Sequence, residues 1–204
     1  ELHTTSARIR DMLLQPMNDY VHQLIGIMNP CHCGNFGHHD RECRCTASSL
    51  SGYQGMLSGA LMERFDIYLF VPSMSWQEEE IIERSEAIYQ RVYDAWIMQI
   101  KRQGKQNAQL TLNELEAYSM MTKRDWRAFY RMAAKHNVSN RVRRSWLALS
   151  RTLADLDRVE AVTMHHIVAG LALMNPDRKE YGQDFDAVKG RSSAGKDRTK
   201  RPRA

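Results

Sequence analysis

The sequence lacks long apolar runs. Stretches such as residues 25–28 and 67–71 fall far short of the roughly 20 residues that a membrane-spanning helix needs. No basic segment followed by an apolar one opens the sequence, so a secretory signal is not expected. With 204 residues, of which 43% are hydrophobic, the chain is long enough for one sizeable core or two small ones. We therefore expect a cytoplasmic protein with no membrane partner.

A phosphate-binding P-loop is also missing. That loop has the pattern Gly-x-x-x-x-Gly-Lys-Ser/Thr between a strand and a helix, so that backbone N–H groups surround the phosphates. The nearest match, residues 190–197, ends in a carboxylate instead of a hydroxyl and stands in a basic low-complexity stretch. No apolar strand ending in Asp-Glu, the Mg²⁺-binding counterpart, is present either. We expect that this chain alone does not hydrolyse ATP.

Most of the chain has almost no net charge. Seven basic residues against one acidic residue give residues 189–204 a charge of +6, whereas the whole chain carries +5, so the remainder carries −1. From residue 177 the composition turns to Gly, Ser, Lys and Arg without apolar periodicity, which predicts a disordered basic tail over residues 177–204. Such a tail either stays solvated or adds nonspecific contacts to nucleic-acid phosphates.

Residues 1–74 have the pattern of strands and loops. Residues 4–15 predict a β-hairpin with a polar turn in its middle. Residues 24–28 predict a short apolar strand, and the continuous apolar run 67–71 predicts a strand covered on both faces, as in a parallel sheet. We expect these elements to belong to an α/β layer.

Residues 75–176 predict an all-α unit. Ser75 and Thr111 each precede a Glu three residues later, which is the capping-box arrangement at a helix start. Gly104 is placed to end the first of these helices, and Ser139 to begin a later one.

Apolar residues at helical spacing predict a buried stripe on two of these helices. The stripes consist of Ile81, Ile88, Val92, Ala95 and Ile100 on the first helix, and of Val142, Trp146, Leu149, Leu153 and Leu156 on the helix after Ser139. Shorter helices fit residues 126–136 and 164–174, and Pro176 ends the second of them.

All four cysteines lie within fifteen positions, as two Cys-x-Cys pairs separated by nine residues. They are Cys31, Cys33, Cys43 and Cys45. In a reducing compartment paired thiols are seldom disulfides, whereas four thiolates satisfy a tetrahedral Zn²⁺ and fix a polar loop. We expect a structural zinc site within residues 29–46, with no open position for catalysis. The alternatives are a redox pair, unligated thiols, or replacement of one sulfur by His32, His38 or His39.

Several motifs resemble one family in order and spacing. They are Met28-Asn29-Pro30-Cys31-His32-Cys33-Gly34, Arg41-Glu42-Cys43-Arg44-Cys45-Thr46, Leu57-Ser58-Gly59, Met62-Glu63-Arg64-Phe65-Asp66, Asn107-Ala108-Gln109-Leu110, Ser139-x-Arg141 and Arg151-Thr152-Leu153-Ala154-Asp155-Leu156. Together they resemble the ComM (YifB) family of magnesium-chelatase-like AAA+ ATPases over residues 1–176. The resemblance implies the C-terminal part of a P-loop AAA+ core, with a pre-sensor hairpin, a sensor 1 strand and a four-cysteine loop, followed by a helical lid.

The resemblance also implies roles for individual residues. Asn29 matches the sensor 1 position, where a side-chain amide contacts the γ-phosphate or orients the attacking water. Arg64 matches the arginine finger that reaches the nucleotide of a neighbouring subunit, and Arg141 matches sensor 2 on the lid, which binds ATP. Arg8 and Arg10 occupy the hairpin that faces the pore of the ring and tracks DNA. From the residues alone, Asn29 is also explained as a turn residue and the arginines as surface cations.

In the complete protein, the resemblance implies a homo-hexameric motor that uses ATP and Mg²⁺ on DNA. It is similar to the branch-migration helicase that assists recombination during natural transformation, and this chain supplies the sensing and trans-acting residues. Two alternatives remain. One is the ATPase subunit of a metal chelatase, which shares the fold and the domain order but lacks the four-cysteine loop of the ComM pattern. The other is a non-enzymatic, zinc-stapled module that binds DNA or protein.

Overall fold

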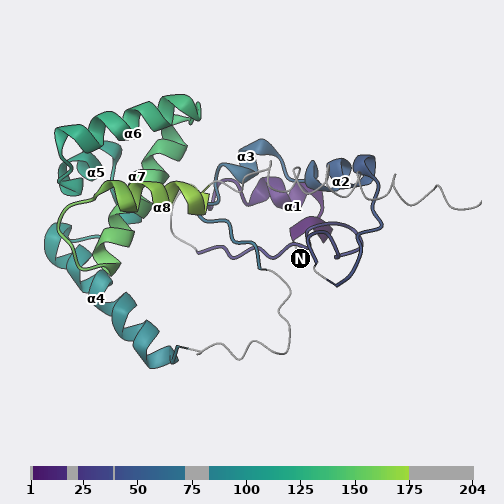
Figure 1. Cartoon of the computed structure of the whole chain (residues 1–204), viewed down its shortest axis with the longest axis horizontal. Helices are drawn as coiled ribbons and strands as arrows, with labels where there is room; N and C mark the ends of the chain where they lie inside the picture. The colour runs from purple at the N-terminus through teal and green to yellow at the C-terminus, as the bar shows by residue number, and fades with distance from the viewer. Residues whose placement is uncertain (1, 18–22, 39, 72–82, 175–204) are drawn as a thin grey trace, which may run out of the picture.

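A computed structural model describes residues 2–17, 23–38, 40–71 and 83–174, and over these residues the chain forms helices and loops but no β-strand (Figure 1). One side of the molecule in Figure 1 holds short elements together with the cysteine loop: η1 (Leu2–Thr4), α1 (Ala7–Met12), α2 (Ala47–Gln54) and α3 (Gly59–Met62). The other side holds α4 (Ser85–Gln103), η2 (Asn107–Gln109), α5 (Leu112–Ser119), α6 (Lys123–Lys135), α7 (Asn140–Leu156) and α8 (Met164–Met174).

Each short helix begins at a hydroxyl residue. Ser6, Thr46 and Ser58 are the N-caps of α1, α2 and α3, and each side-chain oxygen accepts a hydrogen bond from the backbone N–H three residues later. These bonds satisfy one of the donors that a helix start leaves unpaired. Helices this short are not stable alone, so they depend on packing, to which α2 and α3 contribute the buried Tyr53 and Leu61.

The predicted β-hairpin over residues 4–15 is wrong. Ala7–Met12 form α1, capped by Ser6. A tight hairpin turn needs positive φ at its central residues, which favours Asn-Gly or Asp-Gly, and this segment contains no glycine. Ala, Arg and Met favour a helix instead. Arg8 and Arg10 therefore lie on a helix.

The two predicted strands are irregular segments that form no ladder within the described residues. The segment 67–71 reaches the last helix, since the backbone N–H of Tyr68 donates to the carbonyl of Leu173 at 2.8 Å. Apolar side chains of both segments are open to solvent, with exposed fractions of 77% for Ile25, 72% for Ile27, 73% for Leu69 and 82% for Val71. Strands of a parallel sheet are covered on both faces. The composition therefore suits a sheet, but the described residues supply no partner strand for it.

The predicted helix signals of the second half are confirmed where the structure describes them. Thr111 and Glu114 form the reciprocal capping box of α5, with the Thr111 N–H donating to Glu114 Oε2 at 2.7 Å. Gly104 ends α4 with a φ of +74°, a left-handed conformation that favours glycine. Ser139 caps α7. The signal at Ser75 lies outside the described residues.

Helix α7 is the centre of the second group and packs against α4, α5, α8 and η2 (Figure 1). Its Trp146 is fully buried, and the indole N–H donates to the carbonyl of Ile167 on α8 at 2.7 Å. The backbones of α7 and α8 approach closely, because a Cβ added to Gly170 would lie 2.8 Å from Ser150 Oγ. Of the predicted stripe of α7, only Trp146 is buried, and the other four residues are half-buried. The buried face consists instead of Ser145, Trp146, Leu147, Ala148, Ser150, Arg151, Ala154 and Asp155.

The predicted stripe of α4 is buried only in part. Ala95 is 3% exposed, whereas Ile88 and Val92 are 41% and 54% exposed. The first turns of α4 extend away from the other helices, so nothing in the described residues covers them (Figure 1). Ile81 lies outside the described residues, as do Pro176 and the predicted tail. No described helix combines the length and the apolar character that crossing a lipid bilayer would require.

Candidate metal centre and candidate arginine site

The four cysteines come together in one cluster. Their Sγ atoms are 3.4 Å apart between Cys31 and Cys33, 3.7 Å between Cys31 and Cys43, and 3.6 Å between Cys33 and Cys43. All four Sγ atoms, including that of Cys45, lie within 4.8 Å of one another, and all four are free thiols. A tetrahedral ion with Zn–S bonds of about 2.3 Å needs sulfur separations of about 3.8 Å. The cluster therefore fits a metal ion such as Zn²⁺ with small adjustments.

Turns within the loop give the cluster its shape. Gly34 and Gly37 both have a φ of +77°, which favours glycine, and the Gly34 N–H donates to the carbonyl of Cys31 at 3.0 Å. Cys31 is fully buried and packs with Phe36 and with Leu50 of α2. This small core buries little apolar surface, so a bound metal ion would add stability to the fold of the loop.

The thiols differ in acidity. Hydrogen bonds from the backbone N–H groups of Asn35 and Arg44 hold the pKa of Cys33 at about 6. Burial raises the pKa of Cys43 to about 12. At neutral pH and without metal, Cys33 is therefore a thiolate and Cys43 a thiol, so a metal ion must displace the Cys43 proton. Metal affinity at this site should rise with pH.

The nearby histidines have other contacts. Nδ1 of His38 accepts hydrogen bonds from two backbone N–H groups of its own turn, at 3.0 and 3.2 Å. The ring of His32 lies edge-on to that of Tyr53, with centroids 4.6 Å apart. His39 lies outside the described residues. Among the residues described, the donor atoms that converge are the four sulfurs, which favours a four-cysteine site.

Arg64 is the second residue after α3, following the C-cap Glu63. Its Nε donates to the carbonyl of Leu14 at 3.1 Å, and its Nη1 donates to the carbonyl of Ala60 at 2.5 Å. The guanidinium is thus folded against its own chain. Neutral carbonyls bind a guanidinium less strongly than an anionic phosphate does.

The segment after α3 meets the start of α7. Ser139 Oγ donates to Glu63 Oε2 at 3.5 Å, at the long end for a hydrogen bond. Arg141, in the first turn of α7, is partly exposed. The structure thus brings the predicted finger segment against the predicted sensor 2 segment. Asn29 lies by the cysteine loop instead, where its backbone carbonyl accepts a hydrogen bond from Tyr53 Oη at 2.9 Å.

Arg8 and Arg10 share α1 but not a surface. Residues two apart on a helix are separated by about 200° around its axis. Arg8 is exposed, whereas Arg10 is partly buried and donates to the carbonyl of Thr5. The two arginines therefore lie on different sides of a helix and not in the predicted hairpin, and their binding to DNA stays a prediction.

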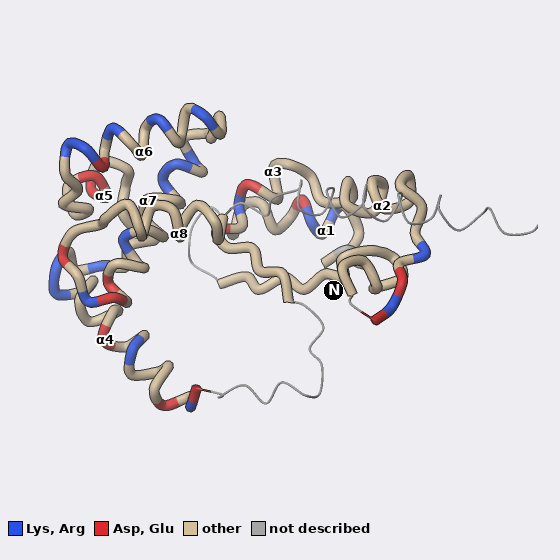
Figure 2. Tube along the Cα trace, in the orientation of Figure 1, with Lys and Arg blue, Asp and Glu red and all other residues tan. Residues whose placement is uncertain are grey.

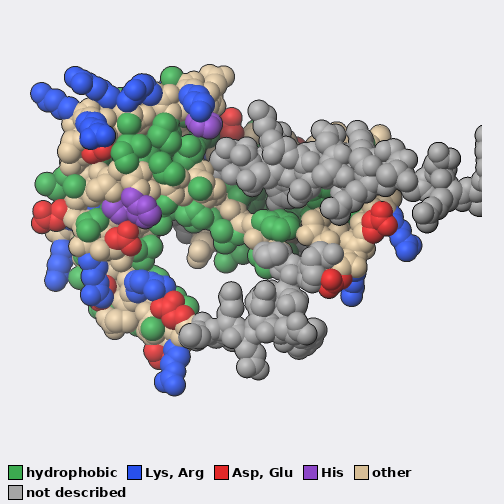
Figure 3. All heavy atoms as spheres, in the orientation of Figure 1, with side chains coloured by type: hydrophobic (Ala, Val, Ile, Leu, Met, Phe, Trp, Pro, Cys, Tyr) green, Lys and Arg blue, Asp and Glu red, His purple; other side chains and the backbone are tan. Residues whose placement is uncertain are grey.

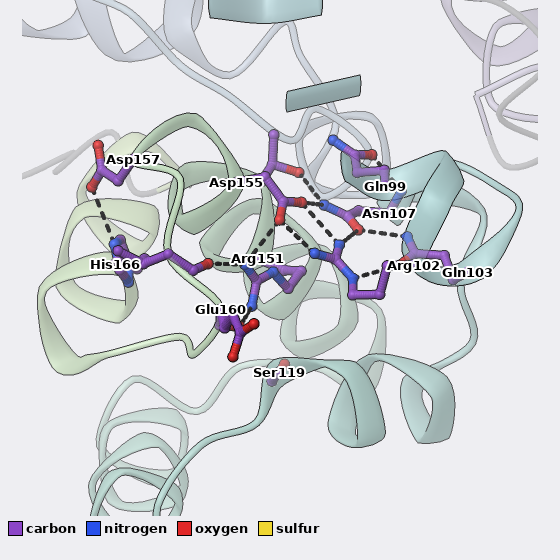
Figure 4. Close-up of polar contacts among 12 residues, drawn as sticks. Gln99, Arg102, Gln103, Asn107, Ser119, Arg151, Asp155, Asp157, Glu160 and His166 are labelled. Carbon is purple, nitrogen blue, oxygen red and sulfur yellow. Dashed lines mark hydrogen bonds and ion pairs between the residues drawn. The ribbon is translucent and has the colours of Figure 1, made fainter. Parts of the chain in front are cut away.

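A buried polar network joins α4, η2 and α7 (Figure 4). Its centre is the carboxylate of Asp155, which is fully buried. Arg102 donates to both oxygens of this carboxylate, at 2.5 and 2.9 Å. Arg151 donates to Oδ1 and Asn107 to Oδ2, each at 2.8 Å. Four donors fill the acceptor capacity of the carboxylate, so the charge is buried but fully paired.

Asn107 connects the network to α4. Its Oδ1 accepts hydrogen bonds from Arg102 at 3.0 Å and from Gln103 at 2.8 Å, and its backbone N–H donates to Gln99 Oε1 at 2.9 Å (Figure 4). The side chain is only 1% exposed. One asparagine thus fixes the connection between α4 and α5 relative to α7.

This network was not predicted as a site, although a signal for it is present. Arg151 and Asp155 are four residues apart and therefore share one face of α7, and a charged pair inside an otherwise apolar helix pattern indicates a buried pair. Burial lowers the pKa of Arg151, whereas the charge of Asp155 raises it. Arg151 also donates to the carbonyl of Val159 at 2.7 Å and to that of Glu160, which fixes the turn after α7.

Comparisons with known proteins match both halves of the chain. Residues 4–79 match the family Magnesium chelatase, subunit ChlI, and residues 82–173 match Magnesium chelatase, subunit ChlI C-terminal. The uncharacterized protein YifB of Salmonella typhimurium is 30% identical over 161 residues, which cover 76% of this chain and 31% of that protein, and YifB of Escherichia coli gives the same values. Competence protein ComM of Haemophilus influenzae is 28% identical over 154 residues, 73% of this chain and 30% of its own length.

The chain therefore spans about a third of the length of the curated relatives it matches. The two family matches follow one another along the chain in the order in which the motifs resemble a core and then a lid. Both kinds of relative, YifB and ComM, align over three quarters of the residues. The chain belongs to the ComM and YifB family of magnesium-chelatase-like AAA+ proteins.

Proposed function

We propose that this chain is the sensing part of a ring-forming, ATP-hydrolysing protein that works on DNA. The observation that carries the proposal is the position of Arg64, the second residue after α3 and in a segment that meets the start of α7, where Arg141 lies. A guanidinium keeps its charge at any physiological pH and stabilises the charge that develops on a transferred phosphoryl group. Two arginines near one junction suit a nucleotide site that is shared between subunits.

Each predicted residue has a distinct role in this proposal. Arg64 is the arginine finger that acts on the nucleotide of the neighbouring subunit, and Arg141 is the sensor 2 residue that contacts ATP. Asn29 is the sensor 1 residue that orients the attacking water. A P-loop is missing from this sequence, so another part of the complete protein would hold Mg²⁺ and the ATP phosphates.

Zn²⁺ has a structural role in this proposal. Four sulfur donors complete a tetrahedral shell and leave no position for a substrate. The cluster begins two residues after Asn29, and the carbonyl of Asn29 is bound by Tyr53 of α2. The bound metal would thus fix the loop and helix that position Asn29. Thiols remain free to bind metal in the cytoplasm, where we place the protein.

A homo-hexamer and DNA complete the proposal. An arginine finger that acts in trans requires a neighbouring copy, and a head-to-tail interface closes into a ring. One relative carries the name competence protein. We infer that the complete protein moves DNA branches during the recombination that accompanies natural transformation.

The domain division into a core part over residues 1–74 and a lid over residues 75–176 belongs to the same proposal.

Two other functions compete with this one. The matched families are named for magnesium chelatase, which favours the ATPase subunit of a metal chelatase as a second candidate. A third candidate is an interaction module without enzymatic activity, in which the zinc loop and the helices bind a partner.

ATP turnover by the complete protein, with and without DNA, separates the three. Turnover that DNA stimulates supports the proposed function. Turnover that is indifferent to DNA supports the chelatase subunit. Absence of turnover from an assembled, zinc-loaded protein supports the interaction module and contradicts the proposal.

A further inference from the structure

The solvent face of α6 carries a stripe of basic side chains. The stripe consists of Lys123, Arg124, Arg127, Arg131 and Lys135, and all five are exposed. Figure 2 shows the basic positions along α6, and Figure 3 shows their side chains gathered along the edge of the molecule that this helix forms. Asp125 is the single acidic residue of the helix, so α6 carries a net charge of +4.

Helical geometry explains why these residues share a face. Arg124, Arg127, Arg131 and Lys135 follow one another at intervals of three or four residues, which places them on one side of an α-helix. The opposite side of α6 holds Phe129 and is buried in the core. The orientation of α6 is therefore fixed by packing, and its basic face cannot turn inward.

The stripe forms no ion pair within the described part of the chain. Two exposed cations elsewhere do form ion pairs: Arg91 pairs with Glu83 at 2.9 Å and Arg158 pairs with Asp94 at 2.6 Å. Like charges three or four residues apart destabilise a helix. The stripe therefore opposes the stability of α6 slightly, and an anionic ligand would relieve this repulsion.

We propose that the basic stripe of α6 binds the phosphate backbone of DNA. This inference rests on the proposed function, since it names a surface by which that function reaches its substrate. The five cations are spread over twelve residue intervals, or about 18 Å at 1.5 Å per residue. At 3.4 Å per phosphate along one strand, that length spans about five nucleotides.

The shape of α6 favours a nucleic acid over the other anionic partners. A helix that lies on a membrane exposes an apolar face beside its basic one, whereas the apolar face of α6 is buried against α7 and α8. A protein interface has an apolar centre, whereas the middle of this stripe consists of Arg127 and Arg131. Phosphate contacts need only a row of cations, and they read no base sequence.

The test is the salt dependence of DNA binding by the 204-residue chain, measured by fluorescence anisotropy with a labelled 30-base-pair duplex and with one of its strands. The test variant replaces Arg124, Arg127 and Arg131 with Gln. The control replaces Arg84, Arg91 and Lys101 with Gln, which removes the same charge from exposed positions at or on α4. Each lost phosphate contact lowers the slope of log K against log salt by about 0.9 for duplex DNA and about 0.7 for a single strand.

We expect the test variant to lower the slope by about 2.7 on duplex DNA and to weaken binding about tenfold or more at low salt, while the control changes little. A third variant with Lys at the three arginine positions should restore the slope, because it restores the charge. Unchanged helicity by circular dichroism confirms that each variant is folded.

Equal losses in the test and control variants would overturn the proposal, since they would show a nonspecific effect of net charge. An unchanged slope in the test variant would overturn it as well, and would assign DNA binding to other cations such as those of residues 189–204. In both cases DNA-stimulated ATP turnover by the complete protein would leave the proposed function standing. If the complete protein neither binds DNA nor shows DNA-stimulated ATP turnover, both the proposed function and the role of the basic stripe are contradicted.

Discussion

At the scale of single residues, the molecule depends on a few buried polar side chains. Asp155 accepts hydrogen bonds from Arg102, Arg151 and Asn107, and these residues come from three different elements. A buried ion network gives little net stability compared with an apolar replacement, but loss of one partner leaves the others unpaired. The network therefore specifies how α4 and η2 sit on α7.

Replacement of Asp155 by Asn should destabilise the chain by about 3–5 kcal/mol, because two guanidinium groups lose their counter-charge. Asp94→Asn is the matched control, since it removes a carboxylate from the pair with Arg158, which is 65% exposed at the side chain. That surface change should cost about 0–1 kcal/mol. Urea unfolding monitored by circular dichroism measures both, and similar midpoints for the two variants would contradict the importance of the network.

Glu114 should make the stability of α5 depend on pH. Hydrogen bonds from Lys105 and Thr111 hold the pKa of Glu114 at about 2, below its ordinary value of 4.5. The folded state therefore favours the ionised form, and this stabilisation is complete above pH 4.5 and is lost as the pH falls toward 2. Unfolding midpoints of the unaltered chain and of Glu114→Gln should differ at pH 7 and converge as the pH falls below 4.5. A constant difference would exclude this role.

A Cys43→Ser variant tests whether the four-cysteine cluster binds Zn²⁺. Cys43→Ser should abolish binding of Zn²⁺, because removal of one sulfur opens a site that needs four. His32→Asn is the control and should retain the metal, since His32 packs on Tyr53 instead of joining the sulfur cluster. Metal content by inductively coupled plasma mass spectrometry decides the point. Full zinc in the Cys43 variant would rule out Cys43 as a required ligand.

At the scale of elements, the helices near residues 126–136 and 164–174 and the helix ends with local chemistry could be predicted, whereas the predicted strands were wrong. The capping box at Thr111 and the stop at Gly104 depend only on neighbouring residues, and both are confirmed. The pattern of residues 4–15 does not distinguish a strand from a helix because it is short, and the N-cap Ser6 favours the helix that forms. The segment 67–71 has the composition of a strand, but a strand also needs partners.

Gly170 of α8 lies where this helix approaches α7 closely. Gly170→Ala should destabilise the chain by about 1–3 kcal/mol, because its Cβ would lie 2.8 Å from Ser150 Oγ and 3.2 Å from a carbon of Trp146. Gly52→Ala, in α2, meets no atom within 4 Å and should be neutral or stabilising by up to about 1 kcal/mol. Thermal unfolding of both variants tests this packing, and equal midpoints would contradict it.

At the scale of the whole molecule, the sequence predicts which cysteines come together. It does not predict which surfaces and long-range contacts the folded chain forms. The spacing of the cysteines predicted the cluster, because short spacings restrict where the sulfurs can go. Net charge does not indicate the basic stripe of α6, because acidic residues elsewhere in the chain balance its charge. The contact between Glu63 and Ser139 joins residues 76 positions apart, which no local pattern encodes.

The exposed apolar segments also belong to this scale. Ile25, Ile27, Leu69 and Val71 are each more than 70% exposed, and the chain spans about a third of its relatives. Contiguous exposed apolar surface normally marks an interface. These segments are therefore the positions where we expect the rest of the AAA+ core to pack.

The most direct measurement of the central claim is ATP turnover by the complete protein carrying Arg64→Ala. Loss of an arginine finger lowers turnover by about 10³-fold or more and leaves ATP binding intact, because the residue acts on the nucleotide of a neighbouring subunit. Mixing this variant with a second one that cannot bind ATP but retains Arg64 should restore part of the turnover, which only a residue acting in trans explains. Normal turnover by the Arg64 variant, or loss of ATP binding with normal assembly, would contradict the account.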